Sequence, residues 1–334
     1  FAVEGGASNG GLAMAMASAL REHGGLWFGW SGETSPQADP ALHIERHANI
    51  TLAQLDLPPQ AVDEYYNGYA NQTLWPLFHY RPDLATYERS FDTAYAQVNK
   101  SFARSLAPLL DKDDVIWVHD YHLIPLGHEL RALGVKNRIG FFLHTPWPTS
   151  EVLVMLPHHR KLVAALFEYN RVGFQTRRWL QAFQDYVIEE LGTDIEPGGW
   201  IAAFGRRVLA RFYPIGIDCS EMNALVRSDA ARKAYRGVRQ RHGDQQIILG
   251  IDRIDYTKGL PQKFAAYAQF LDDNPQSREQ SCLLQIGQPS RSEVEDYREL
   301  HEALNAETGR INGVHGTLSW TPLVYRTQSL QRDT

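Results

Sequence analysis

The sequence predicts an α/β protein of two domains, each built on a parallel β-sheet whose two faces are covered. Short apolar runs alternate with longer helical patterns along most of the chain, which is typical of successive β–α–β units. The apolar runs are almost continuous, as in strands that are buried on both faces. The chain has 334 residues, which is too many for one small core and suits two domains of ordinary size.

The first part of the chain favours helices and an aromatic segment. Leu12–Leu20 is expected to be a helix that begins after SNGG and ends at Gly24 and Gly25. GLWFGWSG, residues 25–32, fits either a strand or a loop, and the aromatic stretch over 63–80 is read as irregular because its apolar residues have no period. A helix over 83–110 is predicted from apolar residues at three- and four-residue spacing, namely Phe91, Tyr95, Val98, Phe102 and Leu106.

From residue 115 onward the strand and helix patterns alternate. Strands are expected at 115–118, 138–144, 171–176, 211–218, 246–251 and 282–287. Helices are expected over 123–133, 177–191, 261–272 and 292–307, and a charged helical stretch over 220–244. This charged stretch separates two sheet-forming regions, so we expect a first domain of residues 1–218 and a second of residues 219–334.

Composition excludes several classes of protein. The net charge of −6 argues against a nucleic-acid-binding protein, so an anionic ligand would need a local cluster of cations. Cys219 and Cys282 are the only cysteines and form no CxxC motif, which indicates a reducing compartment and a cytoplasmic protein. No apolar run approaches the ~20 residues of a membrane span, so no membrane partner is expected. LAMAMASAL resembles a signal-peptide core, but no basic region precedes it, and a buried or amphipathic helix is favoured.

Two polar residues follow the first two strands, at the edge where open α/β sheets bind ligands. Asp120 lies between histidines in HDYH and can accept hydrogen bonds from sugar hydroxyls, although capping of the next helix is an alternative. His144 in FFLHTPWP can bond a sugar hydroxyl through either ring nitrogen, and a core histidine satisfied by the backbone is the alternative. No further ligands stand at metal-binding spacing, so no metal site is predicted. His158 and His159 are read as surface residues.

Cations gather after the strands of the second domain. In RIDYTKG, the fork of Arg253 and the point charge of Lys258 form a clamp suited to a pyrophosphate. This is not a Walker loop, because the glycine follows the lysine. Arg291 in GQPSR supplies a third cation after the next strand. A salt-bridged surface turn is the alternative for RIDYTKG.

Two further features point to ligands less specifically. Gly10 and Gly11 open the first predicted helix, where bare N–H groups and the helix N-terminus can receive a phosphate; a simple helix-entry turn is the alternative. Aromatic residues with polar tips suit the faces of sugars, and ordinary packing under a loop is their alternative. The aromatic residues in question are Trp27, Trp30, Tyr65, Tyr66 and Trp75.

Several long segments together resemble the trehalose-6-phosphate synthase family of retaining glucosyltransferases. The matching segments are GGLWFGWSGE, DEYYNGYANQTLWPLFHY, WVHDYHLIPLGHELR, RIGFFLHTPWP, VGFQT, YPIGID, DRIDYTKGLPQKFAAY and RINGVHGTLSWTPL. The resemblance implies a GT-B fold, in which two Rossmann-like domains face across a cleft. It also implies transfer of glucose from UDP-glucose to glucose 6-phosphate, which gives α,α-trehalose 6-phosphate with retention.

The resemblance assigns roles at the donor. Gly10 and Gly11 match the glycine pair at the UDP-glucose diphosphate, and Arg253 and Lys258 match the diphosphate clamp. His144 matches the histidine near the donor glucose. The leaving diphosphate helps to deprotonate the acceptor, and the two cations replace a metal, so no cofactor is expected.

The resemblance also assigns the acceptor site. Tyr66, Asp120 and Arg291 match contacts to glucose 6-phosphate, with Arg291 at the phosphate. Trp75 matches a tryptophan that lines the acceptor site, and Trp30 is expected near it. Asp120 and His144 therefore join Arg253 and Lys258 as the candidate catalytic residues. A homo-oligomer is compatible with the resemblance.

The two ends of the sequence depart from the family pattern. FAVEGGASNGG lacks the first strand and the phosphate-binding arginine of the family, and the acidic DGMN…KE motif is not found after WTPL. We therefore expect an incomplete second domain and an expressed polypeptide longer than the 334 residues. Alternative functions are a related synthase with another acceptor, such as glucosylglycerol-phosphate synthase, a pseudo-glycosyltransferase, or a non-catalytic sugar-phosphate-binding homologue.

Overall fold

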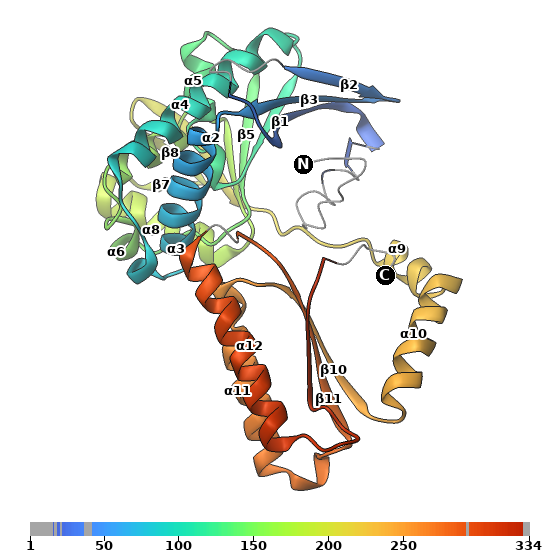
Figure 1. Cartoon of the computed structure of the whole chain (residues 1–334). Helices are drawn as coiled ribbons and strands as arrows, with labels where there is room; N and C mark the ends of the chain where they lie inside the picture. Colours follow the sequence, from blue (N-terminus) through green and yellow to red (C-terminus); the bar gives the residue numbers. More distant parts are fainter. Residues whose placement is uncertain (1–15, 17–18, 21, 37–41, 292–293, 330–334) are drawn as a thin grey trace. The chain divides into compact units, whose positions relative to one another are not determined.

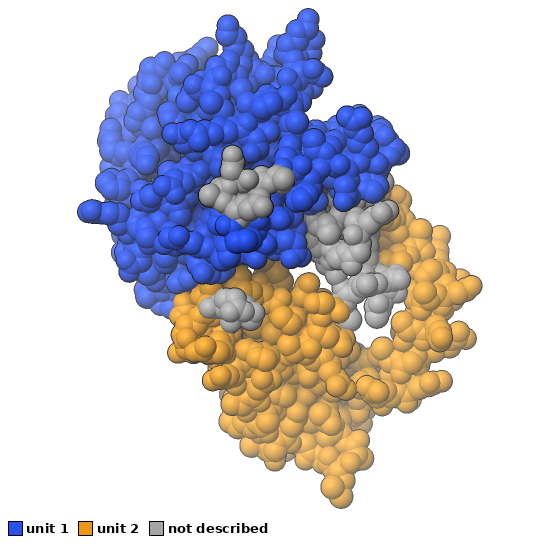
Figure 2. All heavy atoms as spheres, turned by 45° about the horizontal axis from the view of Figure 1, so that its top comes forward, with its two compact units in different colours: residues 1–217 blue, residues 218–334 orange. Residues whose placement is uncertain are grey.

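The computed structural model describes residues 16, 19–20, 22–36, 42–291 and 294–329. The chain divides into two compact units, residues 1–217 and residues 218–334, which Figure 2 shows in different colours. Parallel strands alternate with helices in both units (Figure 1), so the predicted α/β class is confirmed.

The main sheet of residues 1–217 has six strands in the order β4-β5-β6-β9-β8-β7. The first four strands of this order are parallel, and β8 and β7 join the far edge antiparallel. Their bounds are β4 Val115–His119, β5 Arg138–Leu143, β6 Arg171–Phe174, β7 Ile195–Glu196, β8 Trp200–Ala203 and β9 Arg206–Phe212.

The strand expected at 211–218 was placed wrongly, because β9 ends at Phe212. Phe212 is the last residue aligned with β6, the Tyr213 N–H makes a final bond to the Phe174 carbonyl, and Pro214 then has no N–H group for the ladder. The buried part of β9 is Val208, Leu209 and Ala210. Arginines flank this short apolar stretch and concealed it in the sequence.

A smaller sheet orders its strands β1-β3-β2, with β1 parallel and β2 antiparallel to β3. The segment expected to be a strand or a loop forms β1 Gly25–Thr34, and the sheet also contains β2 His43–His47 and β3 Ile50–Leu57. The expected helix Leu12–Leu20 lies mostly outside the described residues.

Longer and shorter α-helices accompany the main sheet in the described part of this unit, after α2 (Pro59–Ala61) and α3 (Trp75–Phe78) of the aromatic stretch. Their bounds are α4 Arg89–Leu106, α5 Leu126–Ala132, α6 Ser150–Leu153, α7 His159–Leu166 and α8 Arg177–Leu191. The helix expected over 83–110 is shorter at both ends, because prolines open the separate 3-10 turns η2 Pro82–Leu84 and η3 Ala107–Leu109. His158 is exposed as expected, but His159 is half-buried, and its Nδ1 lies 2.7 Å from the Tyr186 hydroxyl.

The aromatic stretch over 63–80 is helical, so the irregular assignment was wrong. Short helix α2 Pro59–Ala61 leads into the wide π-helix η1 Val62–Leu74, and α3 Trp75–Phe78 continues it. A π-helix lacks the 3.6-residue period by which helices are recognised in sequence. Gly68 allows η1 to approach α4, since a Cβ there would lie 2.7 Å from the ring of Phe91.

Residues 218–334 contain one parallel sheet in the order β10-β11-β12. Its strands are β10 Gln246–Arg253, β11 Ser281–Gln288 and β12 Leu323–Thr327. The helices are α9 Cys219–Val226, α10 Asp229–His242, α11 Leu260–Asp273 and α12 Glu295–His315, with 3-10 turns η5 Tyr256–Lys258 and η6 Pro275–Ser277. The expected charged helical stretch thus forms two helices, and neither contains a buried residue.

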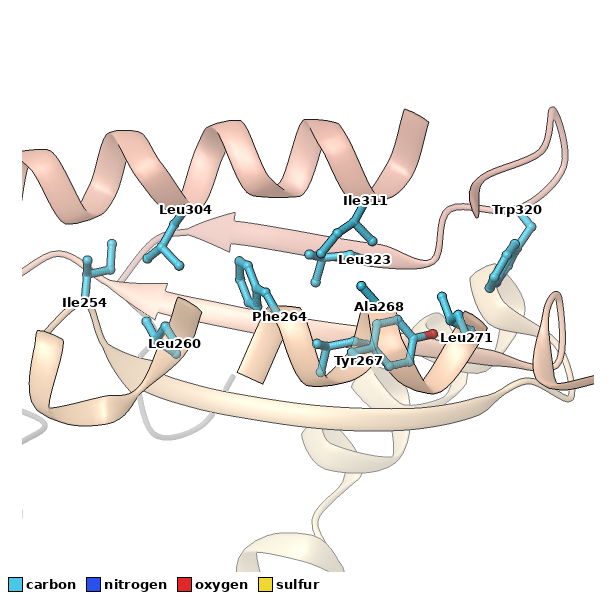
Figure 3. Close-up of a cluster of buried hydrophobic side chains, with 11 residues drawn as sticks. Ile254, Leu260, Phe264, Tyr267, Ala268, Leu271, Leu304, Ile311, Trp320 and Leu323 are labelled. Carbon is cyan, nitrogen blue, oxygen red and sulfur yellow. The ribbon is translucent and has the colours of Figure 1, made fainter. Parts of the chain in front are cut away.

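The core of this unit lies between α11, α12 and the sheet (Figure 3). Phe264 and Leu260 of α11 meet Leu304 and Ile311 of α12 there, and all four are almost fully buried. Ile311 explains why α12 runs past residue 307, the predicted end of this helix. Burial of its side chain outweighs the low helix propensity of the glycines in TGRINGVH.

Candidate active site

Asp120 and His144 lie side by side at the carboxyl edge of the main sheet in residues 1–217. They follow β4 and β5, which are parallel neighbours with His119 aligned to Phe142. The Asp120 N–H donates to the Phe142 carbonyl at 2.8 Å, and the His144 N–H donates to Asp120 Oδ1 at 3.3 Å. Two backbone-anchored bonds thus join the ends of the two strands and orient the Asp120 carboxylate.

Asp120 has an unusual backbone conformation, with φ 71° and ψ 168°. This region is populated mainly by glycine, and other residues there cost about 1–3 kcal/mol. The Asp120 side chain does not cap the following turn η4 Tyr121–Leu123, which removes the capping alternative. Strain of this kind is typical of functional sites, and here it turns an acidic side chain at the strand end.

His144 contacts a second imidazole rather than a backbone group. Its Nε2 lies 3.1 Å from Nδ1 of His119. Burial lowers the pKa of His144 to about 4, and burial together with the neighbouring His144 lowers the pKa of His119 to about 3. Both rings are therefore neutral near pH 7, and neither adds charge to the edge of the sheet.

Tyr66 and Trp75 both pack against the residues that follow Asp120. The Tyr66 ring stacks on the ring of His122, with 5.6 Å between the ring centroids, and contacts Trp30 edge-on, with 5.0 Å between the centroids. Trp75 packs on Tyr121, with 5.7 Å between the ring centroids. Because Trp75 is only 6% exposed, most of its ring belongs to the core.

The wide helix η1 and α3 therefore carry the predicted aromatic residues to the Asp120 turn. Further bonds hold this turn from behind, since the hydroxyls of Tyr65 and Tyr95 donate to the carbonyls of His122 and Tyr121. Sequence reasoning did not identify Tyr95 as a support of the turn, because its spacing reads as ordinary helix core. Tyr66 and Trp75 thus form one aromatic wall against the residues that follow Asp120.

Arg253, Lys258 and Arg291 follow the carboxyl ends of β10 and β11 in residues 218–334. Arg253 is the last residue of β10, opposite Gln288 of β11, and Lys258 is exposed at the end of η5. Asp255 Oδ1 accepts the Thr257 N–H at 3.0 Å and so caps η5. The RIDYTKG turn is therefore a capped 3-10 turn at a sheet edge.

Asp255 is fully buried, which argues against a salt-bridged surface turn. Its Oδ2 lies 3.5 Å from Nη1 of Arg291, whose side chain is 7% exposed, and 3.9 Å from Nη2 of Arg253. The Tyr297 hydroxyl of α12 donates to the same oxygen at 3.3 Å. The carboxylate thus gathers the two arginines, a role that sequence reasoning missed, although the acid stood between the cations of RIDYTKG.

A second polar network occupies the same sheet edge. Lys263 Nζ donates to Asp252 Oδ2 at 2.7 Å and to Gln285 Oε1 at 3.0 Å. Burial by itself would raise the pKa of Asp252, but the hydrogen bonds from Lys263 and Gln285 bring it below its usual value. Gly250 makes room, since a Cβ there would lie 2.1 Å from Gln285 Oε1. Lys263 is thus engaged inside the fold, whereas Lys258 is exposed.

Gly10 and Gly11 lie outside the described residues. Among the residues that the structure describes, no group of three or more His, Cys, Asp or Glu side chains could hold a metal ion. No helix in the described part of the chain is long and apolar enough to cross a membrane.

Polar residues thus lie at the carboxyl ends of parallel strands in both units, the edge at which open α/β enzymes bind their ligands. The model of glycosyltransferase family 20 matches residues 3–334, and the chain belongs to this family. The predicted resemblance and the α/β GT-B fold class are therefore confirmed.

Among proteins of this family, the chain is similar to several trehalose-6-phosphate synthases. The trehalose-6-phosphate synthase of Sinorhizobium fredii is 43% identical over 325 residues, which cover 97% of this chain and 70% of the relative. A Burkholderia xenovorans α,α-trehalose-phosphate synthase (UDP-forming) in complex with glucose-6-phosphate has a TM-score of 0.95 at 43% identity, covering 98% of this chain and 73% of that structure. The Escherichia coli protein bound with UDP-2-fluoro glucose has a TM-score of 0.93 at 41% identity, covering 99% and 73%.

Proposed function

We propose that the chain is an α,α-trehalose-phosphate synthase (UDP-forming), which moves glucose from UDP-glucose to glucose 6-phosphate with retention. One observation carries the proposal: relatives of about the same fold, 43% and 41% identical, bind glucose 6-phosphate and a UDP-glucose analogue. The product is α,α-trehalose 6-phosphate. UDP-glucose is a substrate, and the proposal requires no cofactor.

The edge of the main sheet in residues 1–217 suits neutral sugar hydroxyls. The Asp120 carboxylate, oriented by the His144 N–H, accepts hydrogen bonds from hydroxyls of the acceptor. Tyr66 and Trp75 form the aromatic wall of the acceptor site. His144 is neutral near pH 7 because its pKa is lowered to about 4, so it bonds a hydroxyl of the donor glucose without adding charge.

The cations of residues 218–334 suit the phosphates. Arg253 and Lys258 stabilise the negative charge that develops on the leaving UDP diphosphate. Gly10 and Gly11 are proposed to bring backbone N–H groups to the same diphosphate. The departing diphosphate oxygen takes the proton of the attacking acceptor hydroxyl, so the new glycosidic bond forms on the face that the diphosphate leaves. The two cations supply the positive charge that this step needs.

Arg291 is proposed to bind the phosphate of glucose 6-phosphate. Its guanidinium has five N–H donors, and Asp255 and Tyr297 engage Nη1. Buried Asp255 thus orients the fork for a bidentate contact with phosphate. Loss of Arg291 should weaken glucose 6-phosphate binding far more than UDP binding, and calorimetric titration of both ligands into Arg291→Ala tests this. Equal loss for both ligands would reject the role.

A UDP-release assay tests the function itself. The protein should release UDP from UDP-glucose in the presence of glucose 6-phosphate and form a non-reducing disaccharide phosphate. Turnover with glycerol 3-phosphate instead would identify the alternative synthase with another acceptor. Binding of both ligands without release of UDP would identify a non-catalytic homologue.

A cytoplasmic location and small-molecule substrates are also proposed. Both cysteines are free thiols, Cys219 exposed and Cys282 buried, which suits the reducing cytoplasm. The net charge of −6 suits small anionic substrates held by local cations rather than nucleic acid.

A further inference from the structure

His119 takes no part in the proposed function, yet it has a close contact with a residue that does. It is the last residue of β4, directly before Asp120. Its Nδ1 lies 3.1 Å from Nε2 of His144, and its ring packs against Trp117 at 4.5 Å and Phe142 at 6.5 Å. The His119 ring therefore packs beside two aromatic rings on the same face of the sheet and contacts His144.

A nitrogen-to-nitrogen hydrogen bond between two imidazoles requires one proton between them. A neutral imidazole has one N–H donor and one acceptor nitrogen. If His119 Nδ1 donates, then Nε2 of His144 accepts and Nδ1 of His144 carries the proton. If His144 Nε2 donates instead, Nδ1 of His144 presents a lone pair. The tautomer of His119 therefore determines what the other nitrogen of His144 offers to a substrate.

The backbone alone does not orient the His144 ring. The bond from the His144 N–H to Asp120 Oδ1 holds the main chain. The terminal torsion of histidine is broad and roughly two-fold, so a ring flip would exchange Nδ1 with a carbon atom. The contact with His119 distinguishes the two ring orientations.

We propose that His119 is a positioning residue, which fixes the tautomer and the ring plane of His144 so that one defined nitrogen faces a sugar hydroxyl. The proposal rests on the proposed function, because His144 is placed there at the donor glucose. Burial lowers the pKa of both rings, which keeps the pair neutral and the single shared proton in place near pH 7.

Histidine NMR on the whole chain reads the tautomer directly. Nitrogen-15 labelled histidines are recorded in the wild type and in His119→Phe, His119→Asn and His128→Asn, with His144→Gln used only to assign the His144 signals. His128 is exposed on α5 and serves as the control. The wild type and the control should show one His144 tautomer. His119→Phe should show a mixture, and His119→Asn, whose amide can replace the imidazole hydrogen bond, should restore one tautomer.

Kinetics supply the second measurement. In UDP release, His119→Phe should lose roughly 10- to 100-fold in kcat, as expected when a reacting group is misplaced, with little change in KM for glucose 6-phosphate. His119→Asn should recover most of the loss. Melting temperatures of all variants separate this effect from unfolding.

Two outcomes would overturn the proposal: a single, unchanged His144 tautomer in His119→Phe, or equal losses of activity in the Phe and Asn variants. A wild type that releases no UDP would instead refute the proposed function, while the NMR comparison would still decide whether His119 sets the tautomer.

Discussion

The carboxyl ends of the parallel strands differ in charge between the two units. After β4 and β5, the strands end in Asp120 and in two histidines that burial keeps neutral. After β10 and β11, the chain brings Arg253, Lys258 and Arg291 to one edge, with buried Asp255 among them. The first edge suits hydroxyl groups and the second suits phosphates.

This difference in charge explains how a chain of net charge −6 can bind two anionic substrates. Cations gather at the strand ends of one unit, where buried Asp255 pairs with the two arginines, whereas the strand ends of the other unit carry neutral rings and one strained aspartate. Four experiments test this contrast.

The largest effect is expected for Asp255→Ala. This change leaves Arg291, only 7% exposed, without its buried carboxylate, and removal of one partner of a buried pair costs about 3–5 kcal/mol. Urea unfolding of the variant measures the loss. Glu295→Ala is the control, because its ion pair with Arg298 is more than half exposed and should contribute less than about 1 kcal/mol. Similar losses in both variants would show that Asp255 is not the organiser of the charged edge.

Arg253→Ala and Lys258→Ala should each lower turnover by roughly 10²-fold or more, because each removes charge stabilisation at the leaving diphosphate. Arg253→Lys should also be impaired, since an ammonium cannot replace the planar fork. UDP release at saturating substrates measures the effect, and Lys233→Ala, exposed on α10, is the control. Near-normal turnover in either alanine variant would contradict the clamp.

The strained backbone of Asp120 predicts a smaller effect on stability. Asp120→Gly and Asp120→Ala both remove the carboxylate, but only glycine adopts φ 71°, ψ 168° without strain. The glycine variant should therefore be more stable than the alanine variant by about 1 kcal/mol or more, while both lose activity. Equilibrium unfolding of the pair decides it, and equal stabilities would mean that the turn relaxes readily.

The neutral histidine pair predicts an effect that depends on pH. The folded pKa values of about 3 and 4 lie below the usual 6.5, so the unfolded chain gains protons first as the pH falls. Stability is complete above about pH 6.5 and declines toward pH 4.

Unfolding free energies at pH 7 and pH 5 test this sign in the wild type and in His119→Phe. Between these pH values, the wild type should lose more stability than the variant, by up to about 2 kcal/mol. A larger loss in the variant would mean that the pair is charged in the folded state.

The local sequence pattern was sufficient to predict a strand or helix wherever that element is apolar and regular. The runs that form β4, β5, β10 and β11 were visible because each is short, apolar and followed by a helix. The predicted bounds of β9 were wrong because arginines flank its buried residues. The helix η1 was not predicted because its turn is wider than 3.6 residues.

Local sequence patterns also predicted only part of the candidate site. Asp120, His144, Arg253, Lys258 and Arg291 could be proposed from the sequence, since each follows a predicted strand. Their partners could not, because a hydrogen bond between residues distant in sequence leaves no periodic signal.

The α/β class, the strand ends that carry polar residues and, through long matching segments, the family could all be predicted from the amino-acid sequence. The folded structure was needed to show that Asp255 lies buried beside Arg291, that Asp120 has a strained backbone, and that His119 contacts His144. Strand propensity and apolar period are properties of neighbouring residues. Burial, charge pairing and the choice of proton on an imidazole depend on which distant segments the fold brings together.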